Sequence, residues 1–439
     1  MTLDAADRVS GRLAGLALAV MIVLYVLAGL IAGWPRWPAG LAAWGAAALL
    51  VRRVTRSQLW QIGGLVAIGV VGIVFALLHG VQPPWLRLLD ANAGLLAMIG
   101  AVSFLRMVAM PASAVRVNNP RGPAAFRRTM LGVAVFGAFI NISAPILIGD
   151  QISRGRRLSG FEARSLTRVF SGCPAWSPFF GGMAVVLTLV HGMHLPRVMM
   201  IGLPFAVIGL LYVIIESRWS HPRQVQEFEG YPVSVSALRV PAVLAALVSV
   251  GYLIFDGVSV LVVISCSALL VTVVALLLAD PPRVARRRLV EHVQFGLPSM
   301  SGELFLFLAA GVLAVGLRAA ISATAFSLPM QGFGAFEAAV LLVVMTLVSA
   351  LGAHPVIFIV VVTPLVLPLS PNPDLLAVTY LFGWSLGTCA SPLSGTHLIF
   401  QGRFGIPSLQ GAMRNWPFVA VMSVVAIVFL VAAEKLLTP

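Results

Sequence analysis

The chain has 439 residues, of which 59% are hydrophobic and only 10% are charged, and its mean hydropathy is +1.00. A soluble domain keeps about a quarter of its residues charged, so this composition excludes an ordinary soluble protein. The net charge of +14 would suggest nucleic acid as a partner, but the basic residues lie in short loops between apolar runs, as in membrane proteins. We therefore expect a lipid bilayer around the chain and no nucleic-acid partner.

Apolar runs of spanning length recur along the chain. A hydrocarbon core about 30 Å thick needs about 20 apolar residues in a helix, and lipid offers no partner for bare backbone polar groups. The runs are continuous and rich in Leu, Val and Ala, which indicates helices rather than barrel strands. We predict an all-α polytopic membrane protein with about eleven spans, near residues 13–34, 38–51, 58–80, 91–110, 165–190, 198–216, 237–255, 257–279, 295–320, 375–400 and 415–436.

The basic residues give these spans an orientation. With the N-terminus in the cytoplasm, the Arg-rich loops at residues 52–56, 116–128 and 280–292 all fall on the cytoplasmic side. The same threading places the C-terminus in the periplasm. We therefore expect a multi-pass protein of a bacterial-type inner membrane.

The apolar stretch 129–150 does not fit a simple crossing. Basic clusters flank both ends, with Arg127 before it and Arg154 after it, and a crossing would leave one cluster outside. Its middle, residues 141–145, is Asn-Ile-Ser-Ala-Pro, which disfavours a continuous helix. We predict a re-entrant hairpin that enters and leaves on the cytoplasmic side.

Short motifs recur in the same order at offsets of 210–214 residues. The clearest is Ser-Pro-x-x-Gly, at residues 177–181 and again at 391–395. Constant spacing of several weak matches indicates an internal repeat. The other pairs are Leu105-Arg106 with Leu317-Arg318, Ala144-Pro145 with His354-Pro355, and Leu203-Pro204-Phe205 with Trp416-Pro417-Phe418.

The predicted orientation makes the two repeats inverted. Span 91–110 runs from outside to inside, whereas its counterpart 295–320 runs from inside to outside, because the loop before it is basic. Stretch 333–369 then forms a second hairpin, entered from the periplasm. Many secondary transporters are built from inverted repeats with broken helices near the midplane. The predicted domains are residues 1–89 (scaffold spans), 90–216 (repeat 1), 217–294 (connecting spans and a basic loop) and 295–436 (repeat 2).

This plan resembles the ion transporter superfamily over residues 90–436. The group includes divalent anion/sodium symporters, membrane subunits of tripartite dicarboxylate transporters, and arsenite and sodium/proton antiporters. The tip Asn141-Ile142-Ser143 is similar to the Ser-Asn-Thr tip of the symporters, whereas the second tip, residues 351–355, lacks Ser, Asn and Thr. The resemblance implies a small-molecule or ion substrate and, as a partner, a second copy of the chain in a homodimer.

The paired Ser-Pro-x-x-Gly motifs are the strongest candidates for a substrate site. Proline and glycine interrupt a helix, which exposes N–H groups where one half-helix starts and carbonyls where the other ends. The N–H ends favour anions and the carbonyl ends favour cations. The alternative is a structural kink, which membrane helices often contain. We predict one shared substrate cavity formed by Ser177, Pro178, Gly181, Ser391, Pro392, Ser394, Gly395 and Thr396.

The hairpin tips and one carboxylate complete the predicted site. Asn141 and Ser143 at the first tip and His354 at the second are expected to bind substrate. Glu303 lies early in span 295–320; at a helix centre a carboxylate costs about 2.5–3.5 kcal/mol, so we predict a role in proton or cation coupling. An unperturbed histidine titrates near neutral pH, so His354 is a second coupling candidate. The alternatives are an interfacial carboxylate and a structural histidine.

The sequence contains no Gly-x-x-x-x-Gly-Lys-Ser/Thr loop, and its three cysteines lack metal-ligand spacing. We therefore expect no cofactor or metal, apart from a transported or coupling Na⁺ or H⁺. The predicted function is secondary active transport of a small anionic solute by alternating access, by symport or antiport with protons or sodium. A cation/proton antiporter that exchanges at Glu303 is the alternative. A membrane enzyme or lipid-handling protein fits less well, because no cluster of polar catalytic residues lies at one interface.

Overall fold

The computed structural model describes residues 5–109, 120–154, 156–231, 239–255, 257–324, 329–330 and 332–437. Residues 110–119, which include the start of the predicted basic loop 116–128, lie outside these ranges. Within the described ranges the chain is helical and forms no strand, with one isolated antiparallel bridge between Arg121 and Glu229. Eight of its helices are long and apolar enough to cross a membrane, which confirms the expectation of a helical membrane protein. The count of eleven spans stays a prediction.

The chain divides into two compact units. Unit 1 comprises Met1–Met110 and Ala242–Leu328, and unit 2 comprises Pro111–Pro241 and Pro329–Pro439. Each unit therefore draws on two separate parts of the sequence. The helices of unit 1, with α13 starting just before its boundary, are α1 (Ala5–Leu30), α2 (Trp37–Leu50), α3 (Arg56–Leu78), α4 (Trp85–Asp90), α5 (Ala93–Ser103), α6 (Arg106–Ala109), α13 (Arg239–Ile254), α14 (Val260–Ala279), α15 (Pro282–Glu291) and α16 (Ser301–Thr324).

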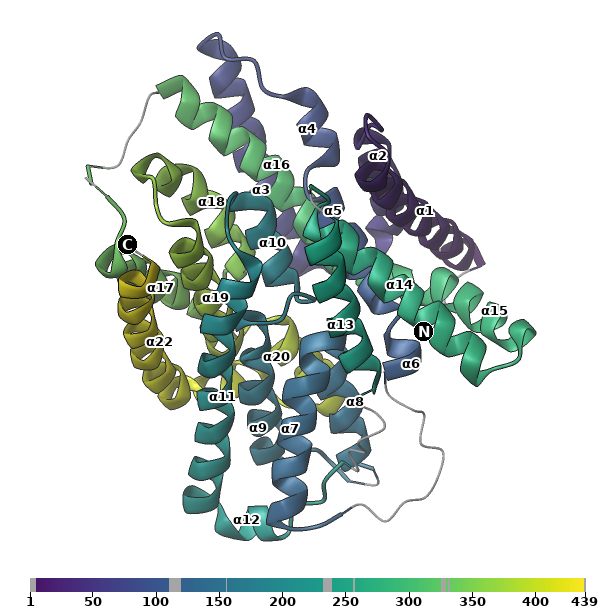
Figure 1. The fold of residues 1–439 in the computed structure, drawn as a ribbon, viewed down its shortest axis with the longest axis vertical. Coiled ribbons are helices and arrows are strands. Elements are labelled where there is room, and N and C mark those ends of the chain that lie inside the picture. Colours follow the sequence, from purple (N-terminus) through teal and green to yellow (C-terminus); the bar gives the residue numbers. More distant parts are fainter. Residues whose placement is uncertain are drawn as a thin grey trace. The chain divides into compact units, whose positions relative to one another are not determined.

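In unit 1, glycines bring α3 and α16 into close contact (Figure 1). A side chain at Gly316 would collide with the backbone of Gly69, and one at Gly72 would collide with the backbone of Gly316. Small residues of this kind let membrane helices approach without a gap. The close approach of α3 and α16 therefore depends on glycines, which have no side chain.

The prediction of a basic loop at residues 280–292 is wrong, because the segment is helical from Pro282 onwards. α15 begins with Pro282 in its first turn, where the missing N–H costs nothing. A π-helical turn at His292–Gly296 and a 3₁₀ turn at Leu297–Met300 then join α15 to α16. Arginine is a good helix former, so a segment rich in arginine can form a helix as well as a loop.

Unit 2 repeats one order of elements in its two halves, each with a hairpin, an interrupted helix and a long helix. The first half has α7 (Pro123–Ile140), α8 (Ser143–Ile152), α9 (Gly160–Ser171), α10 (Gly181–Leu189), α11 (Leu195–Ser220) and α12 (Pro222–Gln226). The second half has α17 (Ala335–Ala350), α18 (Pro355–Val366), α19 (Pro373–Ala390), α20 (Gly395–Phe404), α21 (Ser408–Met413) and α22 (Trp416–Leu437). The predicted internal repeat, its inversion and the re-entry of the hairpins stay predictions.

Helix α19 forms the core of unit 2. Every residue from Asp374 to Ala390 is buried, and α19 packs against α17, α22 and α11. Phe382 stacks on Phe205 of α11 with ring centroids 4.2 Å apart. Around this core, α7, α9 and α11 lie side by side (Figure 1). The second helix break therefore begins at the end of the best-packed element of the unit.

Candidate functional site

The first break separates α9 from α10 and is held by Ser177. A 3₁₀ turn at Cys173–Ala175 follows α9, and regular helix resumes only at Gly181. The Ser177 side chain is fully buried; its hydroxyl donates to the Ala138 carbonyl of α7 and accepts from the Phe179 N–H at 3.2 Å. Pro178 is buried beside it. The Ser177 hydroxyl thus links the break to α7 of the first hairpin, and it already has a hydrogen-bond acceptor and a hydrogen-bond donor as partners.

The first hairpin tip contacts both breaks. Asn141 has a φ of 51°, a backbone conformation that non-glycine residues seldom adopt outside functional sites and tight turns. Its Nδ2 donates to the Phe179 carbonyl at 3.2 Å, while its buried Oδ1 has no hydrogen-bond partner among the described residues. Ile142 reaches the second break, because a Cβ on Gly395 would lie 3.4 Å from its side chain. Ser143 is buried in the first turn of α8.

The second break is a four-residue turn between α19 and α20. The Ser391 carbonyl accepts from the Ser394 N–H at 3.2 Å, and the Ser391 hydroxyl accepts from the Leu393 N–H at 3.3 Å. Ser394 caps α20 by accepting from the His397 N–H at 3.4 Å. Gly395 is exposed and Pro392 is half-buried, whereas Thr396 is buried. The start of α20 is therefore accessible, and its first N–H groups have no partner within the helix.

The second hairpin tip lies against the same break. Gly352 has a φ of 105°, and a Cβ there would come within 2.9 Å of the Leu393 side chain. The His354 ring caps α18 by accepting from the Val356 N–H at 3.2 Å, and it meets Trp384 edge-on at 5.2 Å. These contacts give His354 a structural role at the tip.

Sequence inspection missed a buried hydroxyl at this tip. Ser349, in the last turn of α17, is 1% exposed, and its Oγ has no partner among the described residues. It lies directly against Gly387 of α19. The second tip therefore has a side-chain oxygen after all, two residues before the segment 351–355 where none was expected.

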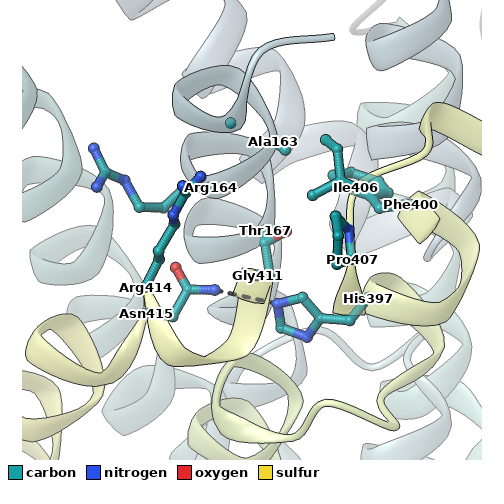
Figure 2. A pocket seen from close by; sticks show the side chains of 11 residues that line it. Ala163, Arg164, Thr167, His397, Phe400, Ile406, Pro407, Gly411, Arg414 and Asn415 are labelled. Atoms are coloured by element: carbon teal, nitrogen blue, oxygen red, sulfur yellow. Dashed lines mark hydrogen bonds between the residues drawn. The ribbon is translucent and has the colours of Figure 1, made fainter. Parts of the chain in front are cut away.

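A buried charged network behind the second break was also missed. Arg168 of α9 donates to Asn415 Oδ1 at 3.0 Å and to the Arg414 carbonyl at 2.9 Å, and it pairs with Glu216 at 3.4 Å. Asn415 Nδ2 lies 3.3 Å from His397 Nε2. Figure 2 shows Asn415 and His397 on the wall of a small pocket, which is also lined by Thr167, Arg164 and Arg414. Arg168 lies within the predicted span 165–190, and an ionisable residue inside a span was the available indication.

Glu303 does not take part in these contacts. It belongs to unit 1, where it lies exposed in the first turn of α16, whereas both tips and both breaks belong to unit 2. Among the described residues, no group of three His, Cys, Asp or Glu side chains could hold a metal ion. The backbone N–H of His194 donates to the Asp374 carboxylate, in the first turn of α19, at 2.5 Å.

Ionic contacts at the helix ends surround the network. Asp150 of α8 and Arg403 of α20 form a bidentate pair at 2.6 and 2.7 Å, which joins the two halves of unit 2. His221 follows α11, and Arg164 lies 3.0 Å from its Nε2. Burial, followed by the nearby Arg164 charge, lowers the pKa of His221 below its usual value.

No protein-family model matches the chain, and no curated protein matches it. The ion transporter superfamily therefore remains a resemblance, based on the repeat plan and on the motifs of the hairpin tips and helix breaks.

Proposed function

We propose that this chain is a secondary active transporter for a small anionic solute, driven by a sodium or proton gradient across the inner membrane. The observation that carries the proposal is the meeting of two hairpin tips and two helix breaks inside unit 2. Asn141 bonds to the first break, Ile142 lies beside Gly395, and Leu393 of the second break lies beside Gly352. Interrupted helices that meet in this way gather free backbone donors and acceptors at one place, as secondary transporters do at their substrate sites.

An anionic substrate is supported by the starts of the half-helices. α10 starts at Gly181 and α20 starts at the exposed Gly395, each directly after a break. A helix N-terminus carries about half a positive charge and several unpaired N–H groups, which together attract carboxylate or oxyanion groups. Alternating access would then expose this site to each side of the membrane in turn.

Sodium coupling is supported by the first tip. Asn141 Oδ1 is buried without a donor among the described residues, and leaving such an oxygen unpaired costs about 1–3 kcal/mol. A hard cation takes oxygen ligands, so a sodium ion at Asn141 would remove this cost. Coupling at Asn141 also keeps the ion within the unit that contains both breaks.

A cation/proton antiporter is the second candidate, and Glu303 favours it. Its carboxylate lies in an apolar helix of unit 1, within electrostatic reach of Arg106. A carboxylate within an apolar, membrane-spanning helix is a candidate functional residue, because it is costly to keep there. Glu303→Gln should abolish pH-driven transport in that case, while protein that remains folded and fully active would leave sodium at Asn141 as the coupling ion.

Uptake by proteoliposomes tests the proposal. Purified protein is reconstituted and offered a panel of labelled small carboxylates and inorganic oxyanions under an inward sodium gradient, an inward proton gradient, or neither. We expect at least one anion to accumulate in the proteoliposomes above its equilibrium level under one of the two gradients. The accumulated anion should leave when an ionophore collapses that gradient. Correctly folded protein that accumulates no anion under either gradient would contradict the proposal.

The proposed orientation has a separate test. Arg127 lies in the first helix of the first hairpin and Arg154 follows its second helix. We propose that both face the cytoplasm, with the N-terminus, so single cysteines at these positions should both resist an impermeant external thiol reagent in intact cells. Labelling of one position but not the other would exclude the re-entrant hairpin.

A further inference from the structure

The inference concerns the buried network behind the second break, and it begins at Arg168. This side chain is 3% exposed and is surrounded by Asn415, the Arg414 carbonyl, Glu216 and the Phe418 ring, whose centroid lies 5.3 Å from the guanidinium carbon. A guanidinium group only donates hydrogen bonds. The atom of Asn415 that faces Arg168 Nε at 3.0 Å must therefore be its oxygen.

The fixed Asn415 amide in turn fixes the protonation of His397. With Oδ1 held by Arg168, Asn415 presents its Nδ2 donor to His397 Nε2 at 3.3 Å (Figure 2). Nε2 must accept this bond, so it carries no proton. A neutral ring then carries its proton on Nδ1, which lies 2.9 Å from the Ser391 carbonyl and 2.9 Å from Ser394 Oγ.

This chain of bonds ends on the carbonyl of Ser391, the first residue of the second break. A carbonyl oxygen has two lone pairs, and Ser391 uses them for the Ser394 N–H and for His397 Nδ1–H. The Ser391 carbonyl is thereby occupied, while the first N–H groups of α20 remain free within the helix. The second break therefore offers N–H donors near a buried guanidinium group, and the carbonyl oxygen of its first residue is not free to bind a cation.

We propose that Arg168, Asn415 and His397 form a one-way hydrogen-bond relay that turns the second break into an anion-binding end, with the three side chains acting as positioning residues. The anion is a carboxylate or oxyanion received by the N–H groups at the start of α20, and this part rests on the proposed transport function. The other charged groups around the relay are Arg164 and Arg414, which line the adjoining pocket, and Glu216, which faces Arg168. Two of these three are cationic, so the surroundings also favour an anion.

Nitrogen NMR of the histidine rings tests the relay without any transport assay. In uniformly ¹⁵N-histidine-labelled protein, the His397 signals are identified by their loss in His397→Gln. We expect a neutral ring with the proton on Nδ1. A proton on Nε2, or a ring protonated at both nitrogens, in the wild-type protein would overturn the relay whether or not the protein transports anything.

Asn415→Asp sharpens the same measurement. The exchange places an acceptor opposite Nε2 in nearly the same volume, so Nε2 should gain a proton while Nδ1 still donates to Ser391, and both nitrogens should appear protonated. Asn415→Ser, which removes the amide without adding charge, should lose the exclusive Nδ1–H form. Asn92→Asp is the matched control, because Asn92 donates to a backbone carbonyl in unit 1 at 2.8 Å, and it should leave the His397 signals unchanged. Unchanged His397 signals in both Asn415 variants would refute the relay.

A transport readout tests the anion-binding part. Once a transported anion is known, Asn415→Asp should raise its KM at least tenfold, with a much smaller change in the sodium concentration that gives half-maximal uptake. An unchanged KM, together with the expected NMR change, would mean that the relay exists but does not position the anion. An Nδ1–H ring in a protein that transports nothing would leave the relay intact and remove only the proposed function.

Discussion

The two halves of unit 2 place their helices in the same order but differ in whether an acceptor oxygen at the break is left free. In the first half, Asn141 Oδ1 is buried without a donor, so an acceptor is left over. In the second half, the Ser391 carbonyl has both lone pairs occupied, and donors are left over at the start of α20. The comparison teaches that a shared backbone plan does not fix ligand chemistry. In the proposed function, a few side chains outside the motif decide whether a break attracts a cation or an anion.

The largest expected effect comes from removing the buried cation of the second half. Arg168→Leu leaves Asn415 Oδ1 and the Arg414 carbonyl without their donor, and it leaves Glu216 unpaired. Hydrogen bonds to charged groups contribute about 1.5–3 kcal/mol each, so we expect a loss of about 3–5 kcal/mol in the free energy of unfolding. Thermal unfolding in detergent measures it. Arg403→Gln, which breaks an exposed pair, should cost less than about 1 kcal/mol, and equal losses in the two variants would argue against a buried network.

Two serines, one in each half, test whether the free and engaged hydroxyls are assigned correctly. Ser177→Ala removes a buried hydroxyl with two partners and should cost about 1–3 kcal/mol in the free energy of unfolding. Ser349→Ala removes a buried hydroxyl without a partner among the described residues. The free energy of unfolding should therefore change by less than about 0.5 kcal/mol, or it should increase. Chemical denaturation of both variants measures the difference. A larger loss of stability in Ser349→Ala than in Ser177→Ala would show that the Ser177 hydrogen bonds do not stabilise the first break.

A smaller, pH-dependent effect is expected at His221 in the first half. Because burial and Arg164 lower its pKa, the folded protein favours the neutral ring. This contribution to stability is fully present above the usual histidine pKa of about 6.5 and is lost as the pH falls through the lowered pKa. His221→Gln should therefore lose less thermal stability than the wild-type protein between pH 7.5 and pH 5.5. A parallel decline of both proteins would show that other groups set the acid sensitivity.

Local sequence patterns were enough to place the hairpin tips and the helix breaks. Proline, glycine and asparagine act on the backbone within one or two residues, so Asn141, Gly352 and the two Ser-Pro-x-x-Gly motifs mark where the helices stop. Charge was a weaker guide, as α15 shows, because a basic segment forms a helix as readily as a loop. The apolar spans were recognisable for the same local reason, since their length and composition are set by the bilayer.

The partners of the breaks could not be predicted, because they come from distant parts of the chain. Arg168 and Asn415 are 247 positions apart, and Asn141 and Phe179 are 38 apart. No periodicity links such residues, and only the packing of α9, α20 and α22 brings them together. The division into two units could not be predicted from the sequence either, because each unit combines two separate segments of sequence. That division places Glu303 in a different unit from the tips, which local sequence patterns could not predict.

The proposed contrast between a cation-binding first half and an anion-binding second half depends most directly on Asn141. The decisive measurement is the sodium concentration that gives half-maximal anion uptake in proteoliposomes, for wild-type protein and for Asn141→Ala. Asn92→Ala is the control, because Asn92 also has a positive φ, of 62°, and also donates to a backbone carbonyl, but lies in unit 1. We predict that Asn141→Ala raises this concentration at least tenfold while Asn92→Ala leaves it unchanged. Uptake that does not depend on sodium, or an unchanged value in Asn141→Ala, would contradict the account.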